Sequence, residues 1–418
     1  MSGTVHIVGA GLAGLSAAVR LLSRGTQVVV HEATAFAGGR CRSFHDAAVG
    51  MTIDNGNHLL LSGNHAALDY VRSIGAEHRL AGPPTAEFAF ADLASGKRWT
   101  LRFNDGRIPF WVFDSSRRVP GTGVLDYVPL ARLLWAPAGR AVGEVIRCEG
   151  LLYERLVEPL LLAALNIDPP LGAARLASAV IRETLALGGR ACRPLIARDG
   201  LGATLVEPAL ALLRQRGAKV LMEHQLRAIR FADRAVAALD FGDETVALGA
   251  GDGVVLAVPP YAAASLVNGL EAPSEFRAIV NAHFRIDPPA DAPLILGVLN
   301  GTVQWLFAFP GRLSVTISAG DRLIDAPREE LAKKIWGEVA SLTGLPAVLP
   351  PWQIVRERRA TFAATPAQDA IRPGAVTTWR NLVLAGDWTD TGLPATIEGA
   401  IRSGNRAADT IANQSKQS

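Results

Sequence analysis

The chain has 418 residues, of which 49% are hydrophobic and 19% charged, and its net charge is +3. This length predicts two domains or an interleaved pair, and the apolar content excludes a disordered chain. So small a net charge gives no reason to expect nucleic acid as a partner. The three cysteines are far apart and form no Cys/His cluster, so neither a metal site nor a disulfide framework is predicted.

The first residues leave little space for a targeting segment. A glycine fingerprint begins at Gly9, too early for a cleaved signal peptide to precede it. No apolar run reaches the roughly 18–20 residues that a spanning helix needs. We therefore expect a cytoplasmic protein, soluble or peripheral on the inner face of the cytoplasmic membrane.

A nucleotide-binding βαβ unit is predicted at the start of the chain. An apolar strand over Val5–Val8 leads into Gly9-Ala10-Gly11-Leu12-Ala13-Gly14, and apolar residues at helical spacing follow. Gly25 ends this helix, a second strand covers Gln27–His31, and Glu32 closes it. Strand, glycine turn, helix, strand and acid in this order are typical of a dinucleotide site, and a chance glycine-rich turn is the weaker explanation.

The chemistry of such a site explains the spacing. Gly9 permits the tight turn, Gly11 lets the backbone approach a pyrophosphate, and Gly14 lets the helix pack closely on the strand. The helix N-terminus, with Leu12 and Ala13, then faces the phosphates with its partial positive charge. Glu32, followed by Ala33, is placed to accept hydrogen bonds from adenosine ribose hydroxyls.

The next motif is Ala37-Gly38-Gly39-Arg40. Here the sequence resembles the amine oxidase and phytoene desaturase group of flavoproteins, in which such a segment contacts the FAD phosphates and ribityl chain. The residues agree with this, because paired glycines bring backbone to a phosphate and Arg40 can form a charge-assisted bidentate pair. An ordinary Gly-Gly loop remains the alternative.

A second anchor lies near the C-terminus. Asn381–Asp387 is predicted to be a strand running into a turn, with Gly386 in the turn and Asp387 placed to accept from ribityl or pyrophosphate-linked hydroxyls. Gly392–Ala400 and a helix through Arg406 follow. The resemblance implies that this helix N-terminus, with Pro394, Ala395, Thr396 and a backbone N–H at Ile397, faces the flavin O2/N1 edge. Simple Rossmann NAD enzymes lack such a motif, so we predict FAD, bound non-covalently.

The organisation follows from these motifs. We predict an α/β fold in which an FAD-binding Rossmann-type domain, glutathione-reductase-like, is interleaved with an α+β substrate domain. The FAD-binding domain would cover about residues 1–80, 195–262 and 375–412, the substrate domain 81–194 and 263–374, and a flexible tail 413–418. Lys219–Arg230 and Gly253–Pro259 resemble a strand pair with an adenine contact near Leu226, although a plain strand-turn-strand explains them equally well.

Further elements are predicted in the two inserts. Strands are expected within Phe88–Phe103 and near Val280–Arg285, Leu294–Leu299, Trp305–Phe309 and Leu313–Ser318. Helices are expected over Val124–Val145, Gly150–Leu165 and about Arg328–Leu342. The helices of the first insert are unusually apolar, which favours an oily substrate tunnel over a site for a charged substrate.

One short segment combines aromatic and basic residues. Phe110-Trp111-Val112-Phe113 is followed by Arg117-Arg118 and bordered by Pro109 and Pro120. This composition is typical of a shallow membrane-docking element. A buried aromatic turn with a solvated Arg pair is the alternative.

Longer stretches resemble one bacterial family more closely. They are Asp54–Leu61, Glu158–Asn166, Arg359–Pro366 and Leu384–Ala400, and the likeness to the squalene-associated FAD-dependent desaturases, the hydroxysqualene dehydroxylases of hopanoid synthesis, runs along nearly the whole chain. Asn57 departs from the pattern, since Gln is more usual there. In this family the loop Asn55-Gly56-Asn57-His58 lies among the expected cofactor contacts.

The resemblance implies reduction of hydroxysqualene to squalene with loss of water. The substrate would be a polyisoprenoid lipid, the partners a membrane surface and neighbouring squalene-pathway enzymes, and an external electron donor is required, which no motif identifies. A carotenoid-type or squalene-type desaturase or isomerase runs a related step in reverse, and the residues alone leave the direction open. An amine oxidase is the third alternative, disfavoured because Thr396 stands where that family places an aromatic residue.

An acid near the flavin is needed for such chemistry. The candidates are His58, Asp54, Asp390 and Glu398, and His58 has an ordinary pKa suited to proton transfer. Each has a structural alternative, because Asp54 and His58 can orient the loop, Asp390 can cap a turn, and Glu398 can interact with its own helix N-terminus.

Overall fold

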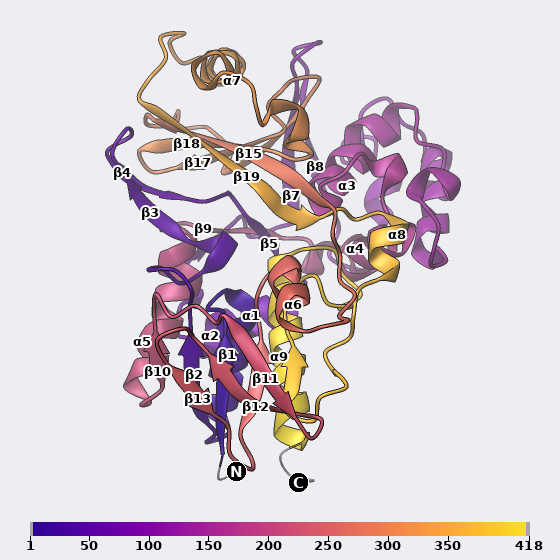
Figure 1. The fold of residues 1–418 in the computed structure, drawn as a ribbon. Helices are drawn as coiled ribbons and strands as arrows, with labels where there is room; N and C mark the ends of the chain where they lie inside the picture. The colour runs from indigo at the N-terminus through magenta and orange to yellow at the C-terminus, as the bar shows by residue number, and fades with distance from the viewer. Residues whose placement is uncertain (1–2, 415–418) are drawn as a thin grey trace.

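A computed structural model describes residues 3–414 of the chain. Its lower half in Figure 1 contains a five-stranded parallel sheet, in the order β10-β2-β1-β14-β20. These strands are β1 (Thr4–Val8), β2 (Gln27–His31), β10 (Lys219–Leu221), β14 (Gly253–Leu256) and β20 (Leu382–Leu384). They come from three separated stretches of chain, so this layer is assembled from segments more than 300 residues apart.

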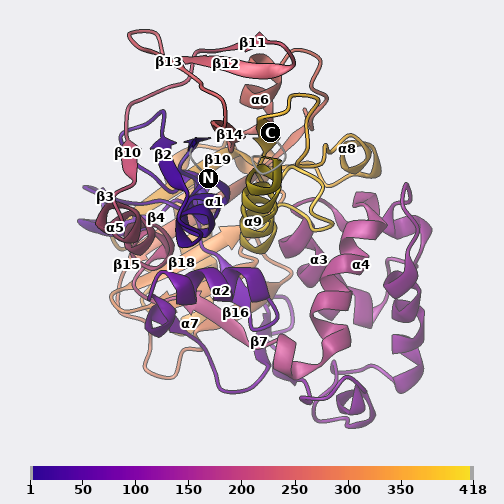
Figure 2. The same ribbon diagram turned by 90° about the horizontal axis from the view of Figure 1, so that it is seen from below.

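Two long helices pack together on this sheet. They are α1 (Leu12–Ser23) and α9 (Ile397–Gln414), which lie side by side in Figure 2. A Cβ at Gly404 would come within 2.1 Å of the Ala13 carbonyl oxygen, so the helices touch at that glycine. Toward the C-terminal ends of both helices, Arg20 of α1 forms an ion pair with Asp409 of α9, with 2.6 Å between Nε and Oδ1. Since α9 extends to Gln414, residues 413 and 414 of the predicted tail are helical, and the rest of that tail lies outside the described residues.

The upper half in Figure 1 contains a seven-stranded sheet, in the order β19-β15-β18-β17-β16-β7-β8. Its strands are β7 (Glu87–Asp92), β8 (Arg98–Arg102), β15 (Phe276–Arg285), β16 (Ile295–Leu299), β17 (Trp305–Phe309), β18 (Arg312–Ile317) and β19 (Trp352–Phe362). The pairing of β16 with β7 is parallel and joins the two inserts into one sheet. The helix α7 (Arg328–Thr343) covers the outer face, with Trp336 against Phe284.

Three small sheets complete the strand content of the described residues. They are β3 (Ser43–Asp46) with β4 (Met51–Asp54), then β5 (Leu59–Leu61), β9 (Pro194–Ala197) and β6 (Leu80–Ala81), and finally β11 (Ala228–Ala232), β12 (Ala235–Asp240) and β13 (Thr245–Ala247). The two stretches predicted to resemble a strand pair, Lys219–Arg230 and Gly253–Pro259, both contribute strands to the five-stranded sheet, but β10 and β14 are not neighbours in it. The first stretch also contains the start of β11, which lies in an antiparallel sheet.

A helical lobe between β8 and β9 stands out from the body (Figures 1 and 2). Its α-helices are α3 (Glu158–Leu165), which continues a π-helical turn over Tyr153–Val157, and α4 (Ala174–Glu183). The helix predicted over Val124–Val145 is wrong in type and length. A 3-10 helix covers Val124–Trp135 instead, because Pro129 removes one backbone donor and the Pro137–Gly139 stretch ends the helical pattern.

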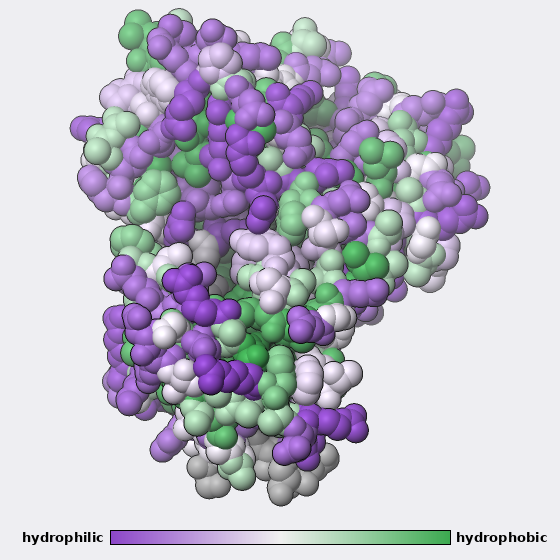
Figure 3. Space-filling model, viewed as in Figure 1, coloured by the Kyte–Doolittle hydropathy of each residue, from purple (hydrophilic) through white to green (hydrophobic). Residues whose placement is uncertain are grey.

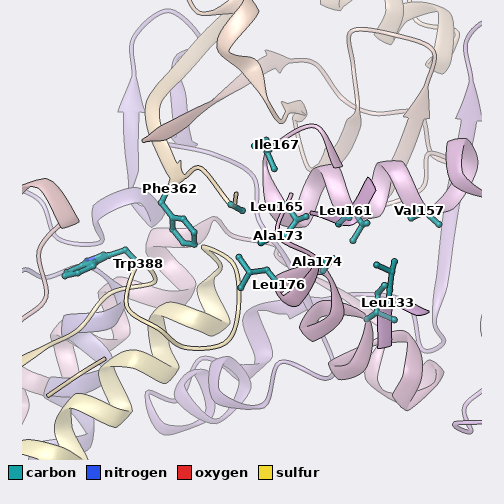
Figure 4. Packing of buried hydrophobic residues seen from close by; sticks show 14 of the residues in the cluster. Leu133, Val157, Leu161, Leu165, Ile167, Ala173, Ala174, Leu176, Phe362 and Trp388 are labelled. Carbon is teal, nitrogen blue, oxygen red and sulfur yellow. The ribbon is translucent and has the colours of Figure 1, made fainter. Parts of the chain in front are cut away.

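The lobe is filled by the largest apolar cluster of the described residues. Figure 4 shows its side chains in a row that runs from Leu133 through Leu161 and Leu165 to Phe362 and Trp388. The cluster thus extends from inside the lobe past the turn that follows β20, to side chains of β14, β20 and β12. The face in Figure 3 is hydrophilic over much of its surface, with hydrophobic residues gathered near its centre around α6 (Pro260–Leu266). Within residues 3–414, no helix is both long and apolar enough to cross a bilayer.

Candidate functional site

The glycine turn between β1 and α1 separates packing roles from a binding role. Gly9 has φ +106°, and a Cβ there would come within 2.4 Å of the Ala257 carbonyl oxygen. A Cβ at Gly14 would come within 1.9 Å of the Gly9 oxygen. Both glycines are therefore required by the fold. A Cβ at Gly11 would meet no atom within 4 Å, so this glycine borders open space.

The N-terminus of α1 faces that space without a side-chain cap. Gly11 is the N-cap residue and offers no side-chain acceptor. Leu12 and Ala13 form the buried first turn, and backbone N–H groups in this turn have no partner within the helix. The uncapped N-terminus of this twelve-residue helix is suited to bind an anion such as a pyrophosphate.

The segment Gly38-Gly39-Arg40 forms a second wall of the same space. The Gly38 amide donates to the Ala10 oxygen at 2.8 Å, and Gly38 and Gly11 form a parallel bridge. Gly38 and Gly39 have positive φ, +105° and +54° respectively. A Cβ at Gly39 would lie 3.5 Å from the Gly11 Cα. The two glycine-rich turns thus approach each other closely enough to enclose one phosphate-bearing ligand.

Glu32 lies at the edge of this cradle. Its Oε2 accepts from the Ala10 amide at 2.8 Å, and its Oε1 accepts from the Thr34 amide at 3.0 Å and hydroxyl at 2.9 Å. The carboxylate is buried and fixed, and Ala33 beside it is exposed. A fixed carboxylate at the end of β2 fits a ribose diol and repels a 2′-phosphate. Thr34 was not predicted, because nothing in the motif marks it.

The segment of Leu226 runs beside Glu32. After β10, the Glu223 amide donates to the Thr34 oxygen at 3.0 Å and the His224 amide to the Glu32 oxygen at 2.8 Å. Leu226 is buried two residues further on. Its predicted adenine contact stays a prediction, now on a segment that the hydrogen bonds place next to the ribose-binding carboxylate.

Arg40 joins the Gly38-Gly39-Arg40 segment to the C-terminal segment that contains Asp387. Its Nη2 lies 2.7 Å from Asp387 Oδ1, and its Nη1 donates to the Ala360 oxygen at 2.6 Å. Burial acts to lower the pKa of Arg40, and the attraction of Asp387 more than offsets it, so the pKa is raised. The two residues assigned to cofactor binding from opposite ends of the sequence therefore form one ion pair.

A buried arginine holds the turn that contains Asp387. Arg372 donates to the carbonyl oxygens of Asp387 at 3.1 Å and Trp388 at 3.3 Å, and it pairs with Asp369 at 3.0 Å. Sequence reasoning placed Arg372 in a linker, since a single Arg before Pro-Gly carries no signal of such contacts. Gly386 has φ +147°, and a Cβ there would come within 2.3 Å of the Trp388 indole nitrogen.

The start of α9 is shaped by Thr396. Its hydroxyl accepts from the Gly399 amide at 3.0 Å, which is the hydrogen bond of an N-cap. The helix then begins at Ile397, after Pro394 and Ala395, and the N–H groups of Ile397 and Glu398 have no acceptor within the helix. Position 396, where the amine oxidases place an aromatic residue, is thus the N-cap of α9 in this chain.

Three of the four proposed acids have structural partners. Asp54 accepts from the Ser43 hydroxyl at 2.5 Å and the Leu201 amide at 2.8 Å, and it lies 3.5 Å from Arg312. These donors hold the carboxylate against the loop that enters the Leu201 turn. Its geometry is that of a loop-orienting residue.

Glu398 and Asp390 are held in the same way. Glu398 accepts from the Ala66 and Ala67 amides at 3.1 and 2.8 Å, at the start of α2 (His65–Ser73), and pairs with Arg402 at 2.7 Å. Asp390 lies 3.1 Å from Arg175; burial acts to raise its pKa, but Arg175 holds the pKa below its usual value. Asp390 is therefore ionised and poorly suited to give up a proton, and the Glu398 carboxylate is engaged by two amides and Arg402.

The loop Asn55–His58, between β4 and β5, lies against the seven-stranded sheet. Asn55 donates to Glu357 at 3.3 Å, and the Asn57 side chain donates to the Thr316 hydroxyl at 3.1 Å. A Cβ at Gly56 would lie 3.1 Å from the Asn281 amide nitrogen. The loop is therefore fitted against β15 and β18. The Asn57 Oδ1 is buried and accepts no hydrogen bond within residues 3–414.

His58 is the one proposed acid whose side chain forms no hydrogen bond with the described part of the chain. Burial lowers its pKa to about 4, with Asp54 and Asp387 acting against this and Arg40 adding to it. The ring is therefore neutral at pH 7. The expectation of a pKa near its ordinary value is wrong, because the ring lies in the dry space near the Arg40–Asp387 pair.

These residues fit a flavin dinucleotide. The glycine cradle and uncapped helix suit a pyrophosphate, Glu32 suits the adenosine ribose, and the Arg40–Asp387 pair suits the linking chain. The start of α9 lies on the same side as Asp387, through the Gly386 amide that donates to the Ser403 hydroxyl of α9 at 2.6 Å. One extended ligand can contact all four features.

Comparisons with known proteins agree. The family described as flavin containing amine oxidoreductase matches residues 12–412. A hydroxysqualene dehydroxylase of Rhodopseudomonas palustris is 64% identical over 98% of this chain and 99% of its own length. One of Zymomonas mobilis is 47% identical over 98% and 99%. The crystal structure of cyclohexylamine oxidase from Brevibacterium oxydans superposes with a TM-score of 0.71 at 17% identity, covering 98% of this chain and 99% of its own.

The structural likeness at this low identity supports the fold, and the sequence relatives define the group. The chain therefore belongs to the flavin-containing amine oxidoreductases, in the family of the hydroxysqualene dehydroxylases, and is an FAD-dependent oxidoreductase.

Proposed function

We propose that this enzyme reduces hydroxysqualene to squalene, with loss of water, in the synthesis of hopanoid precursors. The observation that carries the proposal is the apolar cluster that runs from the lobe to Trp388, the residue after Asp387. Because this cluster reaches the cofactor-binding turn, apolar side chains border the place where a hydrocarbon substrate would meet the flavin. The names of the close relatives support the same substrate.

The chemistry divides between the chain and its cofactor. A reduced flavin, when bound, supplies a hydride from N5. The substrate must lose its allylic hydroxyl as water, which takes one proton and leaves a delocalised cation for reduction. The chain binds the dinucleotide without a covalent bond through Glu32 and Arg40, and its apolar walls exclude the bulk water that would capture the cation.

His58 is the side chain that we assign to hold the proton. Its ring is not engaged by the described residues and lies within electrostatic range of Arg40 and Asp387. With a pKa of about 4, its protonated form is a strong acid and is scarce at neutral pH. If His58 donates, the rate rises as the pH falls from 7 toward 5, about tenfold per unit, and His58→Asn removes that dependence.

Two alternatives share this site. A polyisoprenoid desaturase or isomerase needs the same cofactor and the same dry cavity and differs in the direction of electron flow. An amine oxidase is disfavoured by Thr396, which caps α9 where that family places an aromatic residue.

Product analysis separates the three. The flavin-loaded enzyme is incubated with hydroxysqualene and a chemical reductant, with squalene or a carotene under air, and with a primary amine under air. The proposal predicts that squalene forms from hydroxysqualene in the first reaction and that the other two reactions give no product. Glu32→Ala protein depleted of flavin serves as the control. Oxidised products from squalene, a carotene or an amine, without squalene from hydroxysqualene, would sink the proposal.

A further inference from the structure

Exposed apolar side chains are concentrated on one part of the helical lobe. Among residues 3–414, twelve large apolar side chains are exposed, and six of them lie within residues 108–135. Each of the six is more than 60% exposed. We call these residues the lobe face: Ile108, Phe110, Phe113, Leu125, Val128 and Trp135.

The periodicity of the 3-10 helix shows why these side chains face outward. Residues three apart share an edge of such a helix. One edge, from Tyr127 to Leu133, packs into the apolar cluster. The neighbouring edge carries Leu125 and Val128, which are 81% and 63% exposed, where a solvated helix would carry polar residues.

The aromatic turn is arranged in the same way. Trp111 and Val112 are buried, whereas Phe110 and Phe113, three residues apart, are exposed. The Trp111 ring lies edge-on to the Tyr127 ring at 5.3 Å, which fixes this turn against the 3-10 helix. Half of the aromatic segment is thus buried and half is exposed, which differs from the wholly buried turn of one alternative and leaves membrane docking a prediction.

Arginines border the lobe face. Arg107, Arg117, Arg118 and Arg132 form no ion pair within the described residues. Three aspartates lie among them, of which Asp114 accepts from the Ser116 amide at 2.9 Å and Asp126 from the Gly123 amide at 2.8 Å. The local balance is four positive charges to three negative, so apolar contact dominates and charge contributes a smaller part.

We infer that the lobe face docks on the surface of a phospholipid bilayer that contains anionic lipid. Phe, Trp and Leu side chains displayed beside Arg are the composition that inserts to the depth of lipid headgroups, with the Arg stems lying along the apolar surface. The apolar cluster beneath the face leads inward to Trp388 (Figure 4). The docking stands on the exposed side chains of the lobe face and does not depend on the proposed function.

Vesicle flotation of the flavin-loaded enzyme tests the docking. The vesicles are phosphatidylcholine with phosphatidylglycerol, and the variants are Leu125→Ser with Val128→Ser. Each of these changes removes apolar area that would enter the lipid, so partition should fall about tenfold or more. The matched control is Val348→Ser with Val376→Ser, two exposed valines outside the lobe face, which should float like the wild type.

Further readouts keep the outcomes distinct. Flavin content and Tm should be unchanged in the four Leu and Val changes, because those side chains are exposed. They are also measured for the Arg variant, since Arg117 and Arg118 are half-buried and donate to the Arg102 and Val112 oxygens. Arg117→Gln with Arg118→Gln should weaken flotation on vesicles with phosphatidylglycerol and not on phosphatidylcholine alone. Squalene formation in detergent should be unchanged in the Leu125→Ser, Val128→Ser variant, which separates failed docking from failed catalysis.

Three results would overturn the inference. The first is flotation of the lobe-face variant equal to the wild type, and the second is a wild type that does not float. The third is a wild-type dimer that the variant converts to monomers in ultracentrifugation with no change in flotation, because the face would then be covered by a second copy of the chain.

Discussion

Arg40 Nη2 and Asp387 Oδ1 lie 2.7 Å apart and are separated by 347 residues of sequence. The Asp387 side chain is almost fully buried, and Arg40 also binds the Ala360 oxygen of β19. The pair therefore joins the Gly38–Arg40 segment, the turn that contains Asp387 and the seven-stranded sheet at one point. Its removal should weaken cofactor binding more than it lowers the stability of the separate domains.

A double-mutant cycle measures this relationship. Flavin dissociation constants are compared for Arg40→Gln, Asp387→Asn and the double variant. Since each single change leaves the other partner unpaired, the effects should be non-additive, with a coupling free energy of about 1–3 kcal/mol. Additive effects would indicate that the two residues contact the flavin independently.

Two glycines of the fingerprint should respond differently to alanine. Gly14→Ala places a Cβ 1.9 Å from the Gly9 oxygen and should lower the free energy of unfolding by about 2 kcal/mol or more. Gly11→Ala places its Cβ in open space and should change stability by less than about 0.5 kcal/mol. Gly11→Ala should nevertheless weaken flavin binding, and a variant that keeps full affinity would place the pyrophosphate elsewhere.

Glu32 is predicted to hold the adenosine ribose. Glu32→Ala removes charge-assisted hydrogen bonds that are worth roughly 1.5–3 kcal/mol, so flavin affinity should fall about 10–100-fold. Glu32→Gln keeps an acceptor for the Ala10 amide and should lose less. Retention of flavin by Glu32→Ala through dialysis, measured by absorbance, would show that the ribose lies away from this carboxylate.

Buried histidines predict a loss of stability in mild acid. Burial lowers the pKa of His31 and His283 to about 3 and that of His58 to about 4. Their unfolded pKa values are near 6.5, so only the unfolded chain takes up these protons as pH falls below 6.5.

The free energy of unfolding should therefore be constant above pH 7 and fall between pH 6.5 and 4. Each histidine contributes up to about 1.4 kcal/mol per pH unit. Denaturant unfolding at several pH values measures the slope, and His31→Gln should reduce it by one proton. A slope that appears only below pH 4 would assign the effect to carboxylates instead.

Sequence patterns predicted the elements whose signals are local. The bounds of β2 and β17 match the prediction, because Gln27–His31 and Trp305–Phe309 are short apolar runs between turn residues. The glycine fingerprint located the cradle for the same reason, since Gly9, Gly11 and Gly14 lie in one short stretch and Glu32 closes the strand that follows.

Contacts between distant residues were not predictable. Arg372 sits under the cofactor turn and pairs with Asp369, which also binds Arg175 at 2.7 Å across 194 residues. The His31 ring lies between two other histidines. Its nitrogens are 3.0 Å from a ring nitrogen of His6, in β1, and 2.9 Å from one of His224, which follows β10. Nothing in a single sequence relates these positions, because pairing depends on how the sheets assemble.

The same limit explains the error at Val124–Val145 and the revised view of the acids. The apolar spacing there fits a helix, but Pro129 makes the 3-10 form the accessible one. Glu398 carries the sequence pattern of a helix start, yet its carboxylate is committed to the Ala66 and Ala67 amides of α2. Only the packing of α9 against α2 reveals that partner.

The most direct test of the proposed reaction is an anaerobic single turnover. The purified enzyme is reduced chemically, excess reductant is removed, and hydroxysqualene is added while flavin absorbance and products are followed. The account predicts that the oxidised flavin spectrum returns with one squalene formed per flavin. A flavin that stays reduced, with no squalene formed, would contradict it.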